Sequence, residues 1–372
     1  MYLSSHYEFT EVEKFEEAIL QLALVSLGRK DIVRLLFFCE ARDNEDFLDK
    51  INSIDRILQS VYGDKIPAYS YIPQPVLTSG PIGMEIQYLD ECEATQFSYL
   101  ESEGLHYTKV ENADAIMLFI SAASQRNPSA PVSHQAENAF SAIKNIIEKE
   151  GLVLSDIIRQ WNYIERITEF EDNGKQRYQA FNDARSKFYG NNFKLNGYPA
   201  ATGIGTGHGG IQIEVDVLGC ASNHTMRIDN PRQRAAYDYS HMVLIGDQSK
   251  TTPKFERARY VNLPHGKWIY VSGTAAIRGE LSVEHDASIQ THLTLENIQT
   301  LLSRDNLYMH GQIGEGNMES ARIYVKKKED FPRVKHCLEK VHHINEVIYL
   351  MADICRDSLL VEIEGMAGLS QS

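Results

Sequence analysis

Hydrophobic residues recur at helical spacing in several parts of the chain. In residues 11–38 and 44–61 apolar positions lie three or four apart, although the first stretch ends in an apolar run. We predict an amphipathic helix in each. Apolar residues follow Gln135 and Gln290 at similar intervals, which predicts a helix from each of these positions.

Short apolar runs bounded by Gly and Pro predict strands among these helices. The predicted strand segments are IPAYSYIPQPV and GMEIQYL within 66–89, AIMLFISAA (115–123), the end of LSDIIRQWNYI (154–164), WIYVSGTAAI (268–277) and RIYV (322–325). Helices and strands in this mixture are typical of an α+β protein.

The order of elements occurs twice. The apolar pattern after Gln135 returns after Gln290 with an offset of 155, and Ser121 precedes Ser272 by 151. We therefore predict a duplicated α+β unit with a ligand-binding cleft between its sheets, although repeated strand and helix order also arises by chance. The expected domains are 1–150, divergent and with extra N-terminal helices, and 151–372.

Composition limits the functional classes. Of the 372 residues 43% are hydrophobic and 24% charged, with a formal net charge of −14. This charge argues against a nucleic-acid partner, and an anionic substrate would need a local cluster of Arg or Lys. No apolar run of about 18 residues occurs and the first residues are acidic, so we expect a soluble cytoplasmic protein without a membrane partner. Five scattered cysteines indicate neither a disulfide framework nor a zinc site, and we expect no cofactor or metal.

The closing segment LLVEIEGMA (359–367) carries the clearest candidate chemistry. Strand periodicity places Leu360, Glu362 and Glu364 on one face and Val361 and Ile363 on the other. From this pattern alone an edge strand with solvated glutamates is favoured. The alternative is a carboxylic acid in a partly dry cleft, where burial would raise its pKa and make it a proton donor near neutral pH.

The last third of the chain resembles the YjgF/Rid superfamily. The similar segments are WIYVSGTAAI, QTHLTLENIQTLL, RIYVKKKEDFPRV and LLVEIEGMA. The resemblance implies two YjgF-like (chorismate mutase-like) units packed together, with mixed sheets and helices on one face. It also implies a homotrimer, or a monomer if the duplicated chain fills the other positions itself. Imine deaminases of this superfamily carry an arginine where this chain has Val347, which argues against deamination.

Over about residues 150–367 the chain resembles the chorismatases. The similar segments, in order, are RQWNYI, RYQAFNDARSKFY, YPAATGIGTG, NPRQRAAYDY, PKFERA and CRDSLLVEIEG. The resemblance implies a cofactor-free hydrolase or lyase of secondary metabolism. Such an enzyme protonates the enolpyruvyl ether of chorismate and releases pyruvate with a hydroxybenzoate or a dihydroxycyclohexadiene carboxylate.

Protonating that ether requires an acid that keeps its proton at neutral pH. The resemblance gives this role to Glu362, with Glu364 as the weaker candidate. Carboxylates of the substrate call for bidentate cations, which Arg232 and Arg257 could supply, while Tyr237 and Tyr239 could donate hydroxyl hydrogen bonds. Arg159 could contribute as well, or could form a structural ion pair.

Two further residues bear on the substrate and the product. In the chorismatase branch that yields 3-hydroxybenzoate a cysteine lies seven residues before the catalytic glutamate, as Cys355 does here. Chorismatases usually carry an arginine near the position of Lys250, so either Lys250 replaces it or the substrate differs from chorismate. A Rid-type deaminase and a non-catalytic metabolite-binding protein are the alternative functions.

Overall fold

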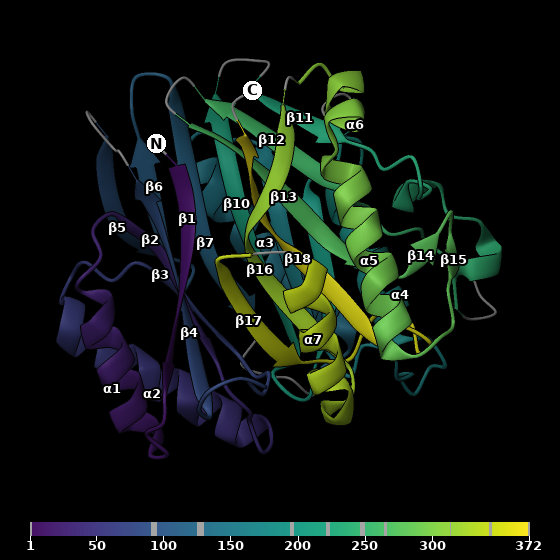
Figure 1. Cartoon of the computed structure of the whole chain (residues 1–372). Coiled ribbons are helices and arrows are strands. Elements are labelled where there is room, and N and C mark those ends of the chain that lie inside the picture. The colour runs from purple at the N-terminus through teal and green to yellow at the C-terminus, as the bar shows by residue number, and fades with distance from the viewer. Residues whose placement is uncertain are drawn as a thin grey trace.

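Three large β-sheets, each covered on one face by helices, build the described part of the protein (Figure 1). The computed structural model describes residues 2–90, 95–124, 130–193, 197–220, 224–245, 250–263, 266–312, 314–341 and 344–370. Within these ranges no helix is both long and apolar enough to cross a bilayer.

The first sheet is built from residues 2–90 and has the strand order β1-β4-β2-β3. Its elements are β1 (Tyr2–Thr10), α1 (Phe15–Ser26), β2 (Ile32–Phe38), α2 (Asn44–Tyr62), β3 (Ala68–Ile72) and β4 (Ile82–Asp90). Helix α1 therefore ends well before residue 38. The predicted helix over 11–38 is wrong in its second half, because Ile32–Phe38 is buried at every position and has no polar face to offer solvent.

The second sheet is built from residues 96–220, in the order β5-β6-β7-β10-β8-β9. Its elements are β5 (Gln96–Ser102), β6 (Leu105–Glu111), β7 (Ala115–Ser124), α3 (Val132–Lys149), the 3₁₀ turn η1 (Leu154–Asp156), β8 (Ile157–Glu165), α4 (Arg177–Tyr189), β9 (Ala200–Thr206) and β10 (Ile211–Cys220).

The third sheet is built from residues 225–370, in the order β11-β12-β13-β18-β16-β17. Its strands are β11 (Thr225–Ile228), β12 (Ala258–Leu263), β13 (Gly266–Ala275), β16 (Glu315–Val325), β17 (Glu346–Met351) and β18 (Val361–Ser370). Its helices are α5 (Ala287–Leu302), α6 (Arg304–Met309) and α7 (Phe331–Val341), with 3₁₀ turns η2 (Ala236–Asp238), η3 (His241–Val243) and η4 (Lys328–Asp330) and a small hairpin of β14 (Ile277–Arg278) and β15 (Leu281–Ser282).

The second and third sheets have the same connectivity, which confirms the expected pair of related α+β units. The first sheet repeats the last four strand positions of this order and lacks only the opening hairpin. Moreover, β3 packs against β7, β9 against β13 and β17 against β1. The chain thus arranges three related units in a closed ring with pseudo-threefold symmetry.

The expected division at residue 150 cuts through the second unit. Strands β7 and β8 lie on either side of that position, and both pair with β10. We therefore propose three units, 2–90, 96–220 and 225–370, in place of the two domains. Since one chain already closes the ring, we also propose a monomer; the homotrimer stays the alternative.

The core is divided between the two faces of the sheets. Each unit has an apolar cluster under its own helices, and a further cluster joins the inner faces of all three units. In β18, Val361 and Ile363 belong to the helix side, as the period of two predicts. Glu362 and Glu364, on the other face, therefore point toward the other units. The edge-strand interpretation is wrong, because β18 lies between β13 and β16 and both acids are buried.

Candidate functional site

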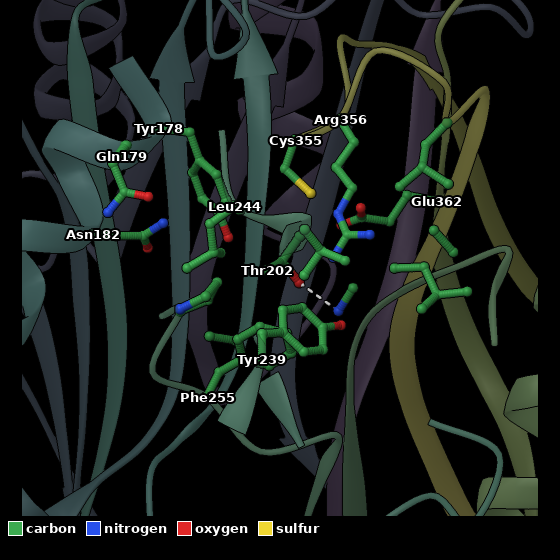
Figure 2. A pocket seen from close by; sticks show the side chains of 18 of the residues that line it. Tyr178, Gln179, Asn182, Thr202, Tyr239, Leu244, Phe255, Cys355, Arg356 and Glu362 are labelled. Carbon is green, nitrogen blue, oxygen red and sulfur yellow. Dashed lines mark hydrogen bonds between the residues drawn. The ribbon is translucent and has the colours of Figure 1, made fainter. Parts of the chain in front are cut away.

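A pocket lies where β9 of the second unit packs against β13 of the third. It occupies roughly 770 Å³, with the open mouth included. Figure 2 shows side chains from four segments around it. They come from α4, from β9, from residues 239–257 and from the segment that runs through Cys355 into β18. Residues of both the second and the third unit are therefore needed to form the pocket.

Glu362 is the single carboxyl group among the described residues that line this pocket. Its side chain is 4% exposed. Burial and the nearby Glu364 charge raise the pKa of Glu362 to about 8, against the opposing effects of Arg159 and Arg257. Glu362 is therefore mostly protonated at neutral pH and can donate a proton inside the pocket.

Gly273 of β13 makes room for this carboxyl group. A Cβ atom at residue 273 would lie 2.1 Å from the Oε1 atom of Glu362. Any larger residue would push the acid out of its place. The glycine of the Ser-Gly dipeptide is thus a steric requirement of the site. The backbone N–H of Gly273 also donates a hydrogen bond to Thr202 Oγ1 at 3.1 Å.

Three guanidinium groups line the same pocket, from Arg185, Arg257 and Arg356. Arg185 and Arg257 are 1% and 4% exposed, and each has a buried Nε atom without a hydrogen-bond partner. Arg257 and Arg356 lie over the ring of Tyr239 at 5.7 and 5.2 Å from its centroid. Three cations against one protonated acid create the locally positive site that an anionic ligand of this acidic chain requires.

Cys355 lies in the loop between β17 and β18 and also lines the pocket. The loop is attached to the second unit, because the Gly205 N–H donates to the Asp353 carbonyl at 2.7 Å and Ile354 bridges to Ile204. Burial, followed by the charge of Glu362, raises the pKa of the Cys355 thiol to about 12. The thiol therefore stays neutral, which makes it a small apolar wall and not a nucleophile.

Four of the six predicted substrate residues, Arg159, Arg232, Tyr237 and Lys250, are not among the described residues that line the pocket. Arg232 is paired with Glu296 on the outer surface at 2.8 Å. The ring of Tyr237 packs at a tilt against that of Tyr198, with ring centroids 5.5 Å apart. Lys250 donates to the carbonyls of His241 and Leu244. Arg232, Tyr237 and Lys250 thus have partners elsewhere, whereas Arg257 and Tyr239 line the pocket.

Glu364 and Arg159 belong to a polar centre where the three units meet. Glu364 is 1% exposed, forms ion pairs with Arg159 and Arg322 and accepts hydrogen bonds from Tyr324 and Thr202. Both of its carboxyl oxygens are therefore engaged behind the pocket, and Glu364 is not among the described residues that line it. Each unit supplies one arginine to a glutamate of the next, namely Arg34 to Glu214, Arg159 to Glu364 and Arg322 to Glu85.

Sequence reasoning missed seven polar residues of the pocket, namely Gln176, Tyr178, Gln179, Asn182, Arg185, Thr202 and Arg356. Tyr178, Asn182 and Arg185 recur every three or four positions on one face of α4, and Arg356 directly follows Cys355. The polar stripe within RYQAFNDARSKFY was a visible signal, because a helix that only packed against its sheet would carry apolar residues there. Arg185 Nη2 donates to Asn182 Oδ1 at 2.6 Å, which fixes its guanidinium group.

The residues that line the pocket are suited to acid–base chemistry on a bound anionic ligand. In the described part of the chain no group of three or more His, Cys, Asp or Glu side chains is arranged to hold a metal ion. The proton donor, the cations and an aromatic wall from Tyr239 and Phe255 converge on one cavity (Figure 2).

Comparisons with known proteins agree with this class of site. The N-terminal profile of the FkbO/Hyg5-like chorismatases matches residues 93–216. The chain is 34% identical over 251 residues to a 3-hydroxybenzoate synthase from Streptomyces hygroscopicus, which covers 64% of this chain and 71% of that protein. It is 32% identical over 216 residues to a chorismatase from the same organism, covering 56% of this chain and 61% of the relative.

A solved structure extends the similarity over the whole chain. The crystal structure of a chorismatase superposes with a TM-score of 0.73 and 20% identity, covering 98% of both chains. The structure of the E. coli YjgF gene product aligns with 39% of this chain and 99% of its own, with a TM-score of 0.27. The fold is that of the chorismatase structure. The chain belongs to the FkbO/Hyg5-like chorismatase family.

Proposed function

We propose that the protein cleaves the enolpyruvyl ether of chorismate, or of a close analogue, and releases pyruvate. The observation that carries this proposal is the buried Glu362, with a pKa of about 8, in a pocket lined by three arginines. An enol ether accepts a proton at its methylene carbon only from an acid that is still protonated, and the two carboxylates of chorismate need cations to replace their hydration. The relatives named above include a 3-hydroxybenzoate synthase and chorismatases.

In the proposed mechanism Glu362 donates its proton to the methylene carbon and leaves an oxocarbenium-like centre. The Glu362 carboxylate can then accept a proton from water as the water attacks that centre, and the resulting hemiketal collapses to pyruvate and the ring alcohol. With water, chorismate gives pyruvate and a dihydroxycyclohexadiene carboxylate. Without net consumption of water it gives pyruvate and 3-hydroxybenzoate. Arg185, Arg257 and Arg356 are the proposed carboxylate ligands.

The test is to incubate the purified protein with chorismate, follow pyruvate by a coupled reaction and identify the ring product by chromatography. The proposal requires pyruvate and one ring product in equal amounts. Ammonia release from 2-aminoacrylate without pyruvate release from chorismate would favour the Rid-type deaminase. Binding of chorismate without turnover would favour a metabolite-binding protein.

The pH dependence of kcat/KM should report the titration of Glu362. Because the donor must be protonated, we expect kcat/KM to be constant at neutral pH and to fall tenfold per pH unit above about 8. In Glu364→Gln the falling limb should move to lower pH, since the Glu364 charge helps to hold the proton on Glu362. If kcat/KM began to fall at the same pH in both proteins, this result would contradict the assignment of the fall to Glu362.

Cys355 is expected to influence the ring product and not the release of pyruvate. The neutral thiol occupies space beside Glu362 that water could otherwise enter. By resemblance to the cysteine-bearing branch, we expect the wild type to form 3-hydroxybenzoate. Cys355→Ala should then divert a large share of the product, about half or more, to the dihydroxycyclohexadiene carboxylate, with kcat for pyruvate changed less than about tenfold. Chromatography of the ring products decides it, and an unchanged product ratio would show that Cys355 does not set the outcome.

A further inference from the structure

A second pocket occupies the equivalent junction between the first and second units. It lies where β3 packs against β7, and β9 against β13 is the corresponding pair at the Glu362 pocket. At the third junction, β17 against β1, the corresponding position is Gly83. A Cβ there would lie within 3.0 to 3.3 Å of the side chains of Ile348 and Phe9, so apolar packing fills this place.

The second pocket repeats the hydrogen bonds of the first. The Ala122 N–H donates to Ser70 Oγ at 2.9 Å, as the Gly273 N–H donates to Thr202 Oγ1. Ser70 Oγ in turn donates to Glu214 at 2.6 Å, a buried residue of β10. The two pockets therefore share the same arrangement of backbone and hydroxyl hydrogen bonds.

Gln212 occupies in the second pocket the position that Glu362 occupies in the first pocket. It pairs with Ser124 at the end of β7, and Glu362 pairs with Ala275 at the end of β13. An amide cannot protonate an enol ether, so this pocket could bind a ligand but not repeat the proposed chemistry.

Gln212 lines the second pocket, and its side chain has a buried acceptor that no described protein group uses. Gln212 is 2% exposed and its Nε2 atom donates to the Tyr71 carbonyl at 2.9 Å, while the buried Oε1 atom has no partner. A buried acceptor without a donor costs free energy, which a ligand with an N–H or O–H group would recover.

The charges around the second pocket are opposite to those of the first. Asp55 and Glu101 line it, and no Lys or Arg is among its described lining residues. Tyr69 donates to Asp55 at 3.0 Å and its ring lies 5.3 Å from that of His106, which provides an aromatic wall. A dicarboxylate would be repelled here, whereas a cation beside a ring is favoured.

We propose that this second pocket binds a small organic ammonium compound, whose N–H group donates to Gln212 Oε1 and whose charge is balanced by Asp55. The site is independent of the proposed chorismate cleavage, since it uses neither Glu362 nor the three arginines. It makes the first unit, residues 2–90, one wall of a ligand site.

Saturation-transfer NMR on the full chain at pH 7 tests the proposal with three benzene-ring probes of similar size, benzylammonium, benzyl alcohol and benzoate. Benzylammonium should bind more tightly than benzyl alcohol, and benzoate should not displace it, because benzoate bound by the three arginines of the Glu362 pocket would not compete. Gln212→Leu should weaken it at least about fivefold, as expected for one hydrogen bond. Asp55→Asn, a change at an exposed side chain that the fold tolerates, should weaken it about threefold and make binding less dependent on salt.

Glu362→Gln is the matched control at the equivalent position and should leave benzylammonium binding unchanged. Absence of benzylammonium binding, equal affinity for benzyl alcohol, displacement of benzylammonium by benzoate, or an affinity unaffected by both Gln212→Leu and Asp55→Asn would overturn the proposal. Should Gln212→Leu fail to fold, Asp55→Asn and the comparison of the three probes still decide the outcome.

Discussion

Glu362→Gln is expected to lower kcat for pyruvate release from chorismate by at least about a hundredfold and by up to about ten-thousandfold. The amide keeps the size of the side chain and its place beside Gly273, but it has no proton to give to carbon. The measurement is the coupled pyruvate assay under saturating chorismate. KM should change little, because the arginines that would bind the carboxylates are intact.

Stability measurements separate loss of the acid from loss of the fold. Because the raised pKa of Glu362 means that folding must protonate this group at neutral pH, its contribution to stability is present at low pH and is lost as pH rises toward about 8. Glu362→Gln removes this titration, so the variant should be at least as stable as the wild type at pH 8. Glu296→Gln, the same chemical change beside Arg232 on the outer surface, should keep kcat within about twofold.

Turnover by Glu362→Gln at the wild-type rate would remove the proposed mechanism even if chorismate were the substrate. A variant that is inactive and also unfolded in urea at lower concentration than the wild type would count against the assignment of Glu362 to chemistry.

The alternation of residues in the closing strand was predictable, but the burial of its acids was not. Period two places Glu362 and Glu364 on one face whatever lies opposite. Whether that face meets water depends on β9 and on Arg159 at the centre of the ring, which are more than 100 positions away in the chain. Local pattern alone therefore favoured solvated glutamates, and the resemblance to chorismatases pointed to the buried acid.

The duplication was visible in the sequence, whereas the third unit was not. The units 96–220 and 225–370 share a full strand order and an offset that can be counted. Residues 2–90 lack the opening hairpin, and in β4 Gly83 replaces the glutamate of the closing motif. With no acid at that position, the relationship is revealed by the spatial order of β1, β4, β2 and β3 and by Glu85, which pairs with Arg322 as Glu364 pairs with Arg159.

The substrate arginines show where short motifs fail. Arg232 and Arg257 both stand in similar polar segments, yet Arg232 pairs with Glu296 on the surface and Arg257 lines the pocket. A turn of a few residues decides between the two outcomes. Arg185 is a different case, since its position on the polar stripe of α4 could have been recognised from helical spacing.

Arg322→Met is expected to lower the free energy of unfolding by about 3 to 5 kcal/mol, the usual cost of removing one partner of a buried ion pair. Arg322 is 3% exposed, and its Nε atom lies 2.7 Å from Glu85 Oε2 of the first unit. No other Lys, Arg or His of the described residues is within ion-pair distance of Glu85. Methionine preserves much of the volume, so the loss should come from the charge left behind. Urea unfolding measures it.

A double-mutant cycle shows whether the uncompensated charge is the cause. Adding Glu85→Gln to Arg322→Met removes that charge and should recover more than half of the lost stability, since Ser5 and Gln87 bond to the same side chain. Burial alone would raise the pKa of Glu85, but the Arg322 charge holds this pKa below its ordinary value. Without Arg322 that pKa should rise, so the single variant should lose less stability at pH 5 than at pH 8. If the two substitutions were additive and the loss of unfolding free energy did not depend on pH, Arg322 would stabilise the ring through packing. The three inter-unit ion pairs would then not be what stabilises the centre of the ring.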